Sequence, residues 1–408
     1  MHGSPDSISD LINKLAAQRE QEWIEFRRAR HCAPEPSGAE TETSQAILTA
    51  MNAAGLVAHI PRREVGVVAD LLPSEPSSGA PPVVVRADID ALRMTDRKTT
   101  EYASRREGLA HACGHDVHTT VVMGVAQLLC SLKDAGLGAS RGVRFLFQSS
   151  EETGDGAQWM IDDGYVSDVE SILGLHVDPL LLAGQVGIRY GALTAAVDEV
   201  IIEIKGAGGH TARPHLTTDP VHCAAQLISH LYQALPRAVD VRSPSVFTIG
   251  QMEAGRTSNV IPDRVRIAGT LRATEKDTRQ TLLDTLEKSC RMFAELSGNT
   301  VEMTFGHRLA AVINTSREAA ALEQSVFDVA GEEAVQILDQ PSMGGEDFGV
   351  YLQNCEGGCQ IRLGCATSLP WPHLHSSEFD IDESVIGLGA RVITRAVLRL
   401  ANREDSNG

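Results

Sequence analysis

Apolar and polar positions follow two different patterns along this chain. Up to about residue 190, short apolar runs such as 65–72, 82–86 and 143–148 are separated by stretches with helical periodicity. Short buried runs that alternate with helices are typical of a mainly parallel sheet with helices on its faces. The first part of the chain is therefore predicted to be α/β.

Between about residues 191 and 305 the order becomes βαββαβ, the order of a ferredoxin-like unit. Strands are predicted at 197–205, 246–252, 263–273 and 300–305, and helices at 219–235 and 274–297. We expect Asp219 to cap the first helix and Pro236 to end it. Thr274 and Asp277 come close to capping-box spacing at the start of the second helix, and Gly298 follows its end.

After about residue 306 the chain returns to mixed helices and strands and closes with an amphipathic helix at 383–400. The middle part is therefore predicted to be an insertion. The expected organisation is one α/β domain built from residues 1–190 and 306–408, interrupted by a second domain at 191–305. The length of 408 residues agrees with two domains, since single hydrophobic cores stop growing at about 250–300 residues.

Charge and composition narrow the class of protein. The formal net charge of −18 argues against a nucleic-acid partner, which would require clustered Lys and Arg. The first residues are polar, and no apolar run approaches the roughly 20 residues of a membrane span, so we expect a cytoplasmic protein without a membrane partner. The eight cysteines are expected to be reduced, and Cys355, Cys359 and Cys365, which lack CxxC spacing, to be small buried residues.

The sequence HACGHDVH at 111–118 gathers three imidazoles, one thiol and one carboxylate: His111, Cys113, His115, Asp116 and His118. Two acidic residues, Glu151 and Glu152, then follow the apolar run 143–148. A divalent transition metal needs such ligands, whereas a hydrophobic core excludes unpaired polar groups. The chain is therefore predicted to be a metallohydrolase.

Each candidate is assigned a role from its place in the chain. Cys113 and His115 precede a predicted helix at 119–132, whose positive end should favour the thiolate form of Cys113. Glu151 and Glu152 follow a strand, where adjacent side chains diverge. One carboxylate can then bind metal while the other serves as general base.

Two more histidines lie where active-site groups of α/β sheets collect. His176 ends the apolar run 171–175, and His375 lies in a Pro- and His-containing loop. A lone histidine is more often a hydrogen-bonded residue than a ligand, and adjacent glutamates are usually solvated. We interpret His118 as a helix-surface residue or one that orients a ligand. Asp116 is interpreted as a helix cap, an orienting carboxylate, or both.

Several motifs occur in one order along nearly the whole chain: RRARHCAPE at 27–35, RADIDAL at 86–92, HACGHDVH at 111–118, QSSEE at 148–152, GLH at 174–176, GGHTARPH at 208–215 and GEDF at 345–348. Together they resemble the amidohydrolase branch of the aminoacylase and carboxypeptidase metallopeptidase clan. Hippurate hydrolases and hydrolases of indole-acetyl amino acids belong to that branch. The fold implied by the resemblance is a catalytic α/β domain interrupted by a ferredoxin-like lid that makes a homodimer.

The resemblance also implies a role for each matching residue. The implied metal ligands are Cys113, His115, Glu152, His176 and His375. The implied general base is Glu151, and Asp88 and Asp116 are implied to orient the ligands without binding the metal. In the lid, His210 matches a histidine that reaches a neighbouring subunit's active site, and Asn259 matches a residue near the substrate carboxylate. Without the resemblance, His210 would be read as a turn residue after two glycines. Five ligands exceed a closed tetrahedral zinc site, so one or two divalent ions, Mn²⁺ or Zn²⁺, are expected.

Departures from the family pattern leave the substrate open. This chain has Arg93 where close relatives carry Pro, and Ser149 and Ser150 where they carry Pro-Ala. Arg93 could pair with an anionic substrate group such as a carboxylate or a nitro group, which would favour an aromatic substrate, or it could simply face solvent. We expect hydrolysis of an N-acyl amino acid. The alternatives are release of ammonia from an aromatic amine such as a nitro-substituted anthranilate, and an inactive binding protein on the same fold.

Overall fold

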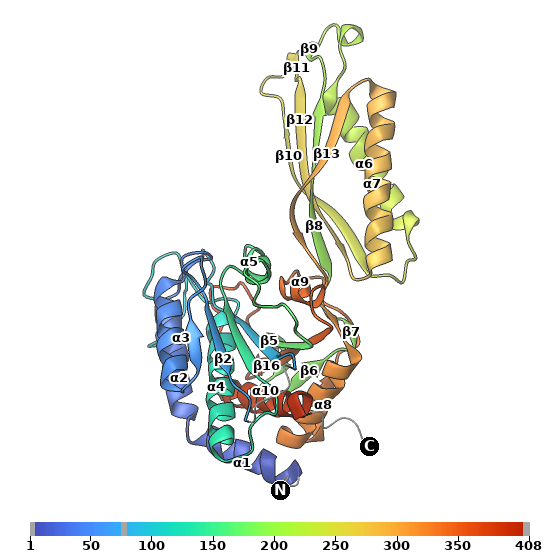
Figure 1. Ribbon diagram of the computed structural model, residues 1–408. Helices are drawn as coiled ribbons and strands as arrows, with labels where there is room; N and C mark the ends of the chain where they lie inside the picture. The colour runs from blue at the N-terminus through green and yellow to red at the C-terminus, as the bar shows by residue number, and fades with distance from the viewer. Residues whose placement is uncertain (1–4, 75–79, 403–408) are drawn as a thin grey trace. The chain divides into compact units, whose positions relative to one another are not determined.

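The computed structural model describes residues 5–74 and 80–402, which form two compact units (Figure 1). One unit combines the chain up to residue 191 with residues 313–340 and the chain from 347 onward. The other combines residues 192–312 with 341–346. The middle segment thus ends at residue 312 and not at the predicted residue 305. The short segment 341–346 also belongs to the second unit. The sequence pattern did not indicate this assignment.

The first unit is built on an eight-stranded sheet in the order β1-β2-β4-β3-β5-β16-β6-β15. The strands are β1 (Val57–His59), β2 (Val67–Leu71), β3 (Val83–Asp88), β4 (Val143–Gln148), β5 (Ser171–Leu182), β6 (Val186–Ile188), β15 (Val335–Ile337) and β16 (Gly357–Ala366). The central pairs β3–β4, β3–β5 and β5–β16 are parallel, whereas β1–β2 and β2–β4 are antiparallel. The predicted mainly parallel α/β sheet is confirmed.

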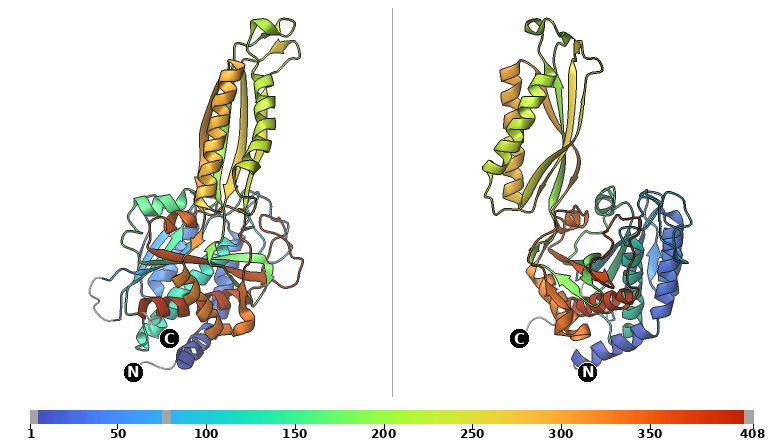
Figure 2. Two further views of the ribbon diagram at one scale, coloured as in Figure 1. Left: turned by 90° about the vertical axis from the view of Figure 1, so that its right-hand side faces the viewer. Right: turned by 180° about the vertical axis from the view of Figure 1, so that it is seen from behind.

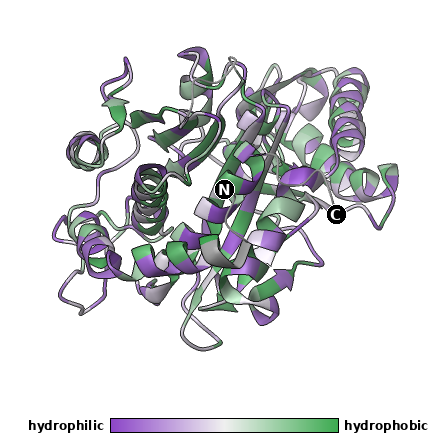
Figure 3. Ribbon diagram, turned by 60° about the horizontal axis from the view of Figure 1, so that its bottom comes forward, coloured by the Kyte–Doolittle hydropathy of each residue, from purple (hydrophilic) through white to green (hydrophobic). Residues whose placement is uncertain are grey.

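Helices cover this sheet, and they are α1 (Pro5–Ala17), α2 (Glu20–Cys32), α3 (Thr41–Ala53), α4 (His115–Asp134), α5 (Gly156–Asp162), α8 (Ser316–Ala330), α9 (Phe348–Leu352), α10 (Ser384–Asn402) and the 3₁₀ turn η2 (Glu332–Ala334). Helix α4 packs against α2 and α10 and is buried along most of its length. Figure 3 shows hydrophobic residues along the central strands and polar residues on the outward turns of the helices. Burial of α4 on all sides places its first turn inside the unit, at the edge where β3 and β4 end.

The second unit has the predicted βαββαβ order, with β8 (Ala196–Lys205), α6 (Pro220–Ala238), β10 (Ser245–Ala254), β12 (Arg264–Ala273), α7 (Lys276–Ser297) and β13 (Thr300–Leu309). Its four strands form an antiparallel sheet in the order β10-β12-β8-β13. Figure 2 shows both helices on the same face of this sheet. The remaining short elements are β7 (Gly191–Ala192), β9 (Gly209–His210), η1 (Pro214–Leu216), β11 (Val260–Ile261) and β14 (Ile313–Asn314).

The helix ends of the second unit test the local predictions. Asp219 caps α6 by accepting hydrogen bonds from two backbone amides, and Gly298 ends α7 in the left-handed conformation with φ of +68°, both as predicted. Pro236 does not end α6, which continues to Ala238. A proline in the last turn removes only one of the final intrahelical hydrogen bonds. The predicted near capping box of α7 is also wrong, because Glu275 is the residue that precedes its first turn.

Two expectations from composition can be compared with the structure. All eight cysteines are free thiols, and Cys359 and Cys365 are buried in the core of the first unit. No helix within residues 5–74 and 80–402 is long and apolar enough to cross a membrane.

Candidate metal centre

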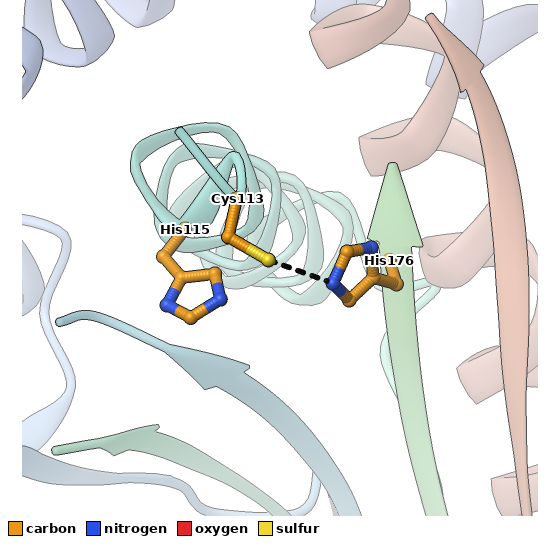
Figure 4. Close-up of side chains that lie close together, drawn as sticks. All are labelled: Cys113, His115 and His176. Carbon is orange, nitrogen blue, oxygen red and sulfur yellow. Dashed lines mark hydrogen bonds between the residues drawn. The ribbon is translucent and has the colours of Figure 1, made fainter. Parts of the chain in front are cut away.

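The predicted ligands converge at the edge of the first unit's sheet where β3 and β4 end. Figure 4 shows Cys113 and His115 at the start of α4, with His176 facing them from β5. The Sγ atom of Cys113 lies 3.4 Å from Nε2 of His176. Gly114 between the two α4 ligands has φ of +86°, and a Cβ there would collide with Val177, so only glycine allows this turn against β5.

All five predicted ligands enter compact groups of potential ligand atoms within 4.8 Å of one another. One group is Cys113, His115 and His176, a second is Cys113, Glu152 and His375, and a third is His115, Glu151 and Glu152. Glu152 Oε1 lies 3.8 Å from His115 Nε2 and 3.6 Å from His375 Nε2. The groups overlap at Cys113, His115 and Glu152, which is what two neighbouring ion positions would require.

Two atoms of this cluster make it suited to a cation. Among the residues that the structure describes, His115 Nε2 and Glu152 Oε1 are buried without a hydrogen-bond partner. Leaving buried polar atoms unpaired costs free energy, and a divalent ion would satisfy both. Zinc accepts thiolate, imidazole and carboxylate donors, and manganese accepts carboxylate donors. The residues present therefore fit a divalent metal centre.

The pKa of Cys113 does not follow the prediction. Burial raises the pKa of this thiol well above its ordinary value, and the neighbouring carboxylates of Glu152 and Glu151 act in the same direction. Desolvation is the largest cause of this shift, and it acts in the direction opposite to the one expected from the helix terminus. Burial also raises the pKa of Glu152. A bound cation would favour the charged, metal-binding form of both groups and so oppose the effect of burial.

The surroundings of His176 favour the neutral imidazole, which is the form that binds a metal. Its Nδ1 hydrogen-bonds the carbonyl oxygen of Val177 at 2.7 Å, which leaves Nε2 directed at Cys113. Burial lowers the pKa of His176 well below its ordinary value, and His118 and Arg362 lower it further. The strand does not end at His176 as predicted. β5 stays paired with β16 as far as Leu182, but its pairing with β3 ends at Gly174, so His176 faces the space beyond β3.

His115 is oriented by a carboxylate that the sequence analysis missed. Its Nδ1 lies 3.0 Å from Oδ1 of Asp90, whereas Asp88, the predicted supporting residue, lies 3.8 Å away. Asp90 also accepts hydrogen bonds from Ser37 Oγ and from the backbone amide of Glu152, so one carboxylate aligns two ligands. The signal was present in the sequence, because two aspartates spaced by two residues project to the same side of an extended chain.

His118 is fully buried, so the expectation of a helix-surface residue is wrong. Its Nε2 accepts a hydrogen bond from the Val177 amide at 2.9 Å, and its Nδ1 donates to Asp88 at 2.6 Å. Asp88 is also bonded to the buried Arg86 at 2.6 Å. His118 and Asp88 thus join α4, β3 and β5 behind the ligands, which matches the other predicted role for His118.

Backbone turns with positive φ present the carboxylates and His375. Ser150 has φ of +59°, and its amide donates to the buried carboxylate of Glu40, which also accepts from Ser149 Oγ at 2.7 Å. This sharp turn directs both following glutamates toward His115, but only Glu152 also approaches His375. His375 has φ of +61°, and its amide donates to the carbonyl of Ala112 at 2.8 Å. Such non-glycine conformations cluster at functional sites.

The other named residues lie elsewhere. His111 is buried, burial lowers its pKa to about 3, and it joins none of the ligand groups. Arg93 is exposed and makes no hydrogen bond or ion pair with another described residue. His210 and Asn259 belong to the second unit, where His210 is exposed on β9 and Asn259 precedes β11.

A parallel α/β sheet that gathers thiol, imidazole and carboxylate ligands beside a further glutamate defines a metal-dependent hydrolase. Residues 84–399 match the Peptidase family M20/M25/M40, and the chain belongs to this family. It is an enzyme of the amidohydrolase branch, which acts on amide C–N bonds.

The relatives cover nearly the whole chain. The chain is 39% identical to "Probable hydrolase sll0100" of Synechocystis sp., over 94% of this chain and 97% of that protein. It is 33% identical to N-acetyl-L-cysteine deacetylase of Bacillus subtilis, over 95% of this chain and 90% of that protein. The crystal structure of the Bacillus subtilis YXEP protein, a dinuclear metal-binding peptidase from the M20 family, matches with a TM-score of 0.81 and 28% identity, covering 95% of this chain and 99% of the other.

Proposed function

We propose that the protein hydrolyses the amide bond of an N-acyl amino acid, a small substrate that carries a carboxylate. The observation that carries this proposal is the convergence of Cys113, His115, Glu152, His176 and His375 beside the additional carboxylate of Glu151. The deacetylation of N-acetyl-L-cysteine named for the Bacillus subtilis relative supports an acylated amino acid as the substrate class.

We infer that Cys113, His115, Glu152, His176 and His375 hold two divalent ions, Mn²⁺ or Zn²⁺. The overlap of the ligand groups at Cys113, His115 and Glu152 supports two neighbouring positions. The dinuclear centre named for the related Bacillus subtilis structure supports the same number. Such ions lower the pKa of water and polarise a carbonyl group when they are bound.

The proposed role of Glu151 is proton transfer. Its carboxylate accepts a proton from the attacking water and then delivers it to the leaving nitrogen, so the amine departs as a neutral group. Glu151 is suited to this role because its carboxylate lies 3.8 Å from His115 Nε2 and shares a group with His115 and Glu152, but it does not belong to the groups that contain Cys113. Asp90 and His118 keep the imidazoles and the Glu152 backbone in place during the reaction.

The products distinguish this reaction from the aromatic alternative. Incubated with Mn²⁺ or Zn²⁺ and N-acetyl or N-benzoyl amino acids, the enzyme is expected to release free amino acid with kcat/KM of about 10⁴ M⁻¹s⁻¹ or more. Nitro-substituted anthranilates are assayed in parallel for ammonia. Ammonia from the anthranilates alone would replace the amide reaction by aromatic amine hydrolysis. No turnover of either class with bound metal would favour an inactive binding protein.

Arg93 and Asn259 are proposed to contact the substrate carboxylate. The exposed guanidinium of Arg93 has no partner among the described residues and is therefore available to an anion. Arg93→Gln is expected to raise KM for N-acyl amino acids more than it lowers kcat, because the contact would be present in both ground state and transition state. An unchanged KM would assign Arg93 to the solvent-exposed surface.

We further propose that the second unit forms a homodimer and that His210 acts at the neighbouring subunit's active site. Strands β10 and β13 are the edges of its sheet and can pair with another copy. Mixing inactive His210→Ala subunits with inactive Glu151→Gln subunits should then restore part of the activity in hybrid dimers. Absence of rescue, with subunit exchange confirmed by mass spectrometry, would indicate a site complete within one chain.

A further inference from the structure

A buried guanidinium joins the start of α4 to the loop that precedes α10. Arg27, on α2, is fully buried. Its Nε donates to Asp116 at 2.7 Å, its Nη2 to Asp380 at 3.2 Å and its Nη1 to Glu383 at 3.3 Å. One side chain therefore binds carboxylates from two segments that are more than 260 residues apart in sequence.

Both segments carry predicted metal ligands close to the carboxylate that Arg27 binds. Asp116 directly follows His115, and Asp380 lies in the same loop as His375. The two segments also meet through the hydrogen bond from the His375 amide to the carbonyl of Ala112. The separation of the ligand-bearing segments is thus set at two places, one on the backbone and one at Arg27.

The carboxylates on both sides are held by further fixed donors. His31 Nδ1 lies 2.7 Å from the Asp116 oxygen that accepts from Arg27. Tyr102 donates its hydroxyl proton to Asp380 at 2.7 Å, and the Arg27 guanidinium stacks 4.8 Å from the centre of the Tyr102 ring. Arg27, His31 and Tyr102 together therefore hold the two carboxylates, and Arg27 is the residue among them that hydrogen-bonds both.

We propose that Arg27 is a positioning residue for the metal centre. It holds the segment of Cys113 and His115 at a fixed position relative to the segment of His375. The planar guanidinium directs separate N–H groups at Asp116, Asp380 and Glu383, an arrangement that the single ammonium of lysine cannot reproduce. This inference rests on the proposed metal centre but not on the proposed substrate.

The test compares three variants by chelator competition on protein loaded with Zn²⁺ or Mn²⁺. Arg27→Lys keeps the buried charge and is expected to weaken metal binding about 10–100-fold, the usual cost of losing a residue that orients ligands. Arg28→Gln removes the neighbouring arginine, which contacts Glu383 and the Tyr102 ring but neither Asp116 nor Asp380, and should leave metal affinity unchanged. Arg395→Lys alters another buried arginine, bound to Asp328 between α10 and α8, and controls for general destabilisation.

Thermal unfolding of the metal-free variants separates positioning from stability. Arg395→Lys should lower the unfolding temperature without changing metal affinity, whereas Arg27→Lys should change metal affinity even where its unfolding temperature matches that control. Equal metal affinity in folded Arg27→Lys and the wild type would overturn the inference. Failure of the wild type to bind metal would instead overturn the proposed metal centre.

A second variant decides the question if Arg27→Lys does not fold. Asp380→Asn removes the charge of a partly exposed carboxylate on the His375 side and leaves the Arg27–Asp116 pair intact. It should weaken metal binding in the same direction. In the double variant Arg27→Lys/Asp380→Asn, the loss of metal affinity should be smaller than the product of the two single losses. Both substitutions break the same contact between Arg27 and Asp380. Unchanged affinity in Asp380→Asn would overturn the inference.

Discussion

Replacing Cys113 by alanine is expected to abolish turnover and to lower the bound metal, as measured by elemental analysis of the purified protein. The thiol belongs to two ligand groups, one with His115 and His176 and one with Glu152 and His375, so its loss disturbs both proposed ion positions. His115→Ala and His176→Ala should act similarly, since each removes an imidazole directed at the same cluster. Chelator treatment should inactivate the wild type, and restoring the metal should recover its activity.

The matched control for these variants is His111→Ala. His111 is a buried histidine of the same sequence motif but lies outside every ligand group, so this variant should retain its metal stoichiometry. Full activity of a chelated wild-type sample shown to be free of metal would contradict the proposed centre. So would Cys113→Ala protein that keeps the wild-type metal content.

The metal affinity itself should depend on pH in a defined direction. Burial raises the pKa of the Cys113 thiol, and only the thiolate is a competent ligand, so metal binding must release its proton. Apparent affinity should therefore rise with pH in the wild type, and more steeply than in Cys113→Ala. Equal slopes for the two proteins would show that Cys113 does not lose a proton on binding.

The second large effect should separate the two adjacent glutamates. Glu151→Gln is expected to keep the fold and the metal but to lose kcat by about 10²-fold or more, because an amide cannot accept the proton from water. Glu152→Gln should instead lose metal, since Glu152 Oε1 is buried, has no hydrogen-bond partner among the described residues and faces both His115 and His375. The measurements are steady-state kinetics and metal content on the same protein samples.

The two glutamine variants serve as controls for each other, because they change neighbouring residues by the same chemistry. If Glu151→Gln lost its metal while Glu152→Gln retained it, the two roles would be exchanged. If both retained metal and activity, neither carboxylate would have the proposed role, and the catalytic proton acceptor would have to be sought elsewhere.

Much of the fold follows from local patterns. The apolar run at 143–148 coincides with β4, and the six elements of the second unit occur in the predicted order. The Asp219 cap and Gly298 at the end of α7 are likewise local features that depend on nearby backbone groups. Periodicity, caps and turn residues act over a few positions, so the sequence is sufficient to identify them.

The candidate ligands could be named from the sequence because the motifs concentrate thiol, imidazole and carboxylate side chains in a few short segments. How those residues are held depends on contacts between distant segments. Asp90 aligns His115, His118 lies buried against β5, and Arg27 joins α2 to segments near residues 116 and 380. No periodicity within a single segment identifies which of two aspartates faces an imidazole.

The remaining properties of the site depend on burial and on strand pairing. The sequence by itself determined the strands, the helices and the candidate ligands, because hydrophobic periodicity and motif spacing are properties of neighbouring residues. Only the tertiary structure decided that burial raises the pKa of the Cys113 thiol, because its environment is assembled from α4, β5 and the end of β4. The tertiary structure also decided that His176 lies inside β5 and not at its end. The pairing of β5 with β3 stops at Gly174, but its pairing with β16 continues to Leu182. Desolvation and strand pairing depend on every surrounding segment, and that information exists only once the chain has folded.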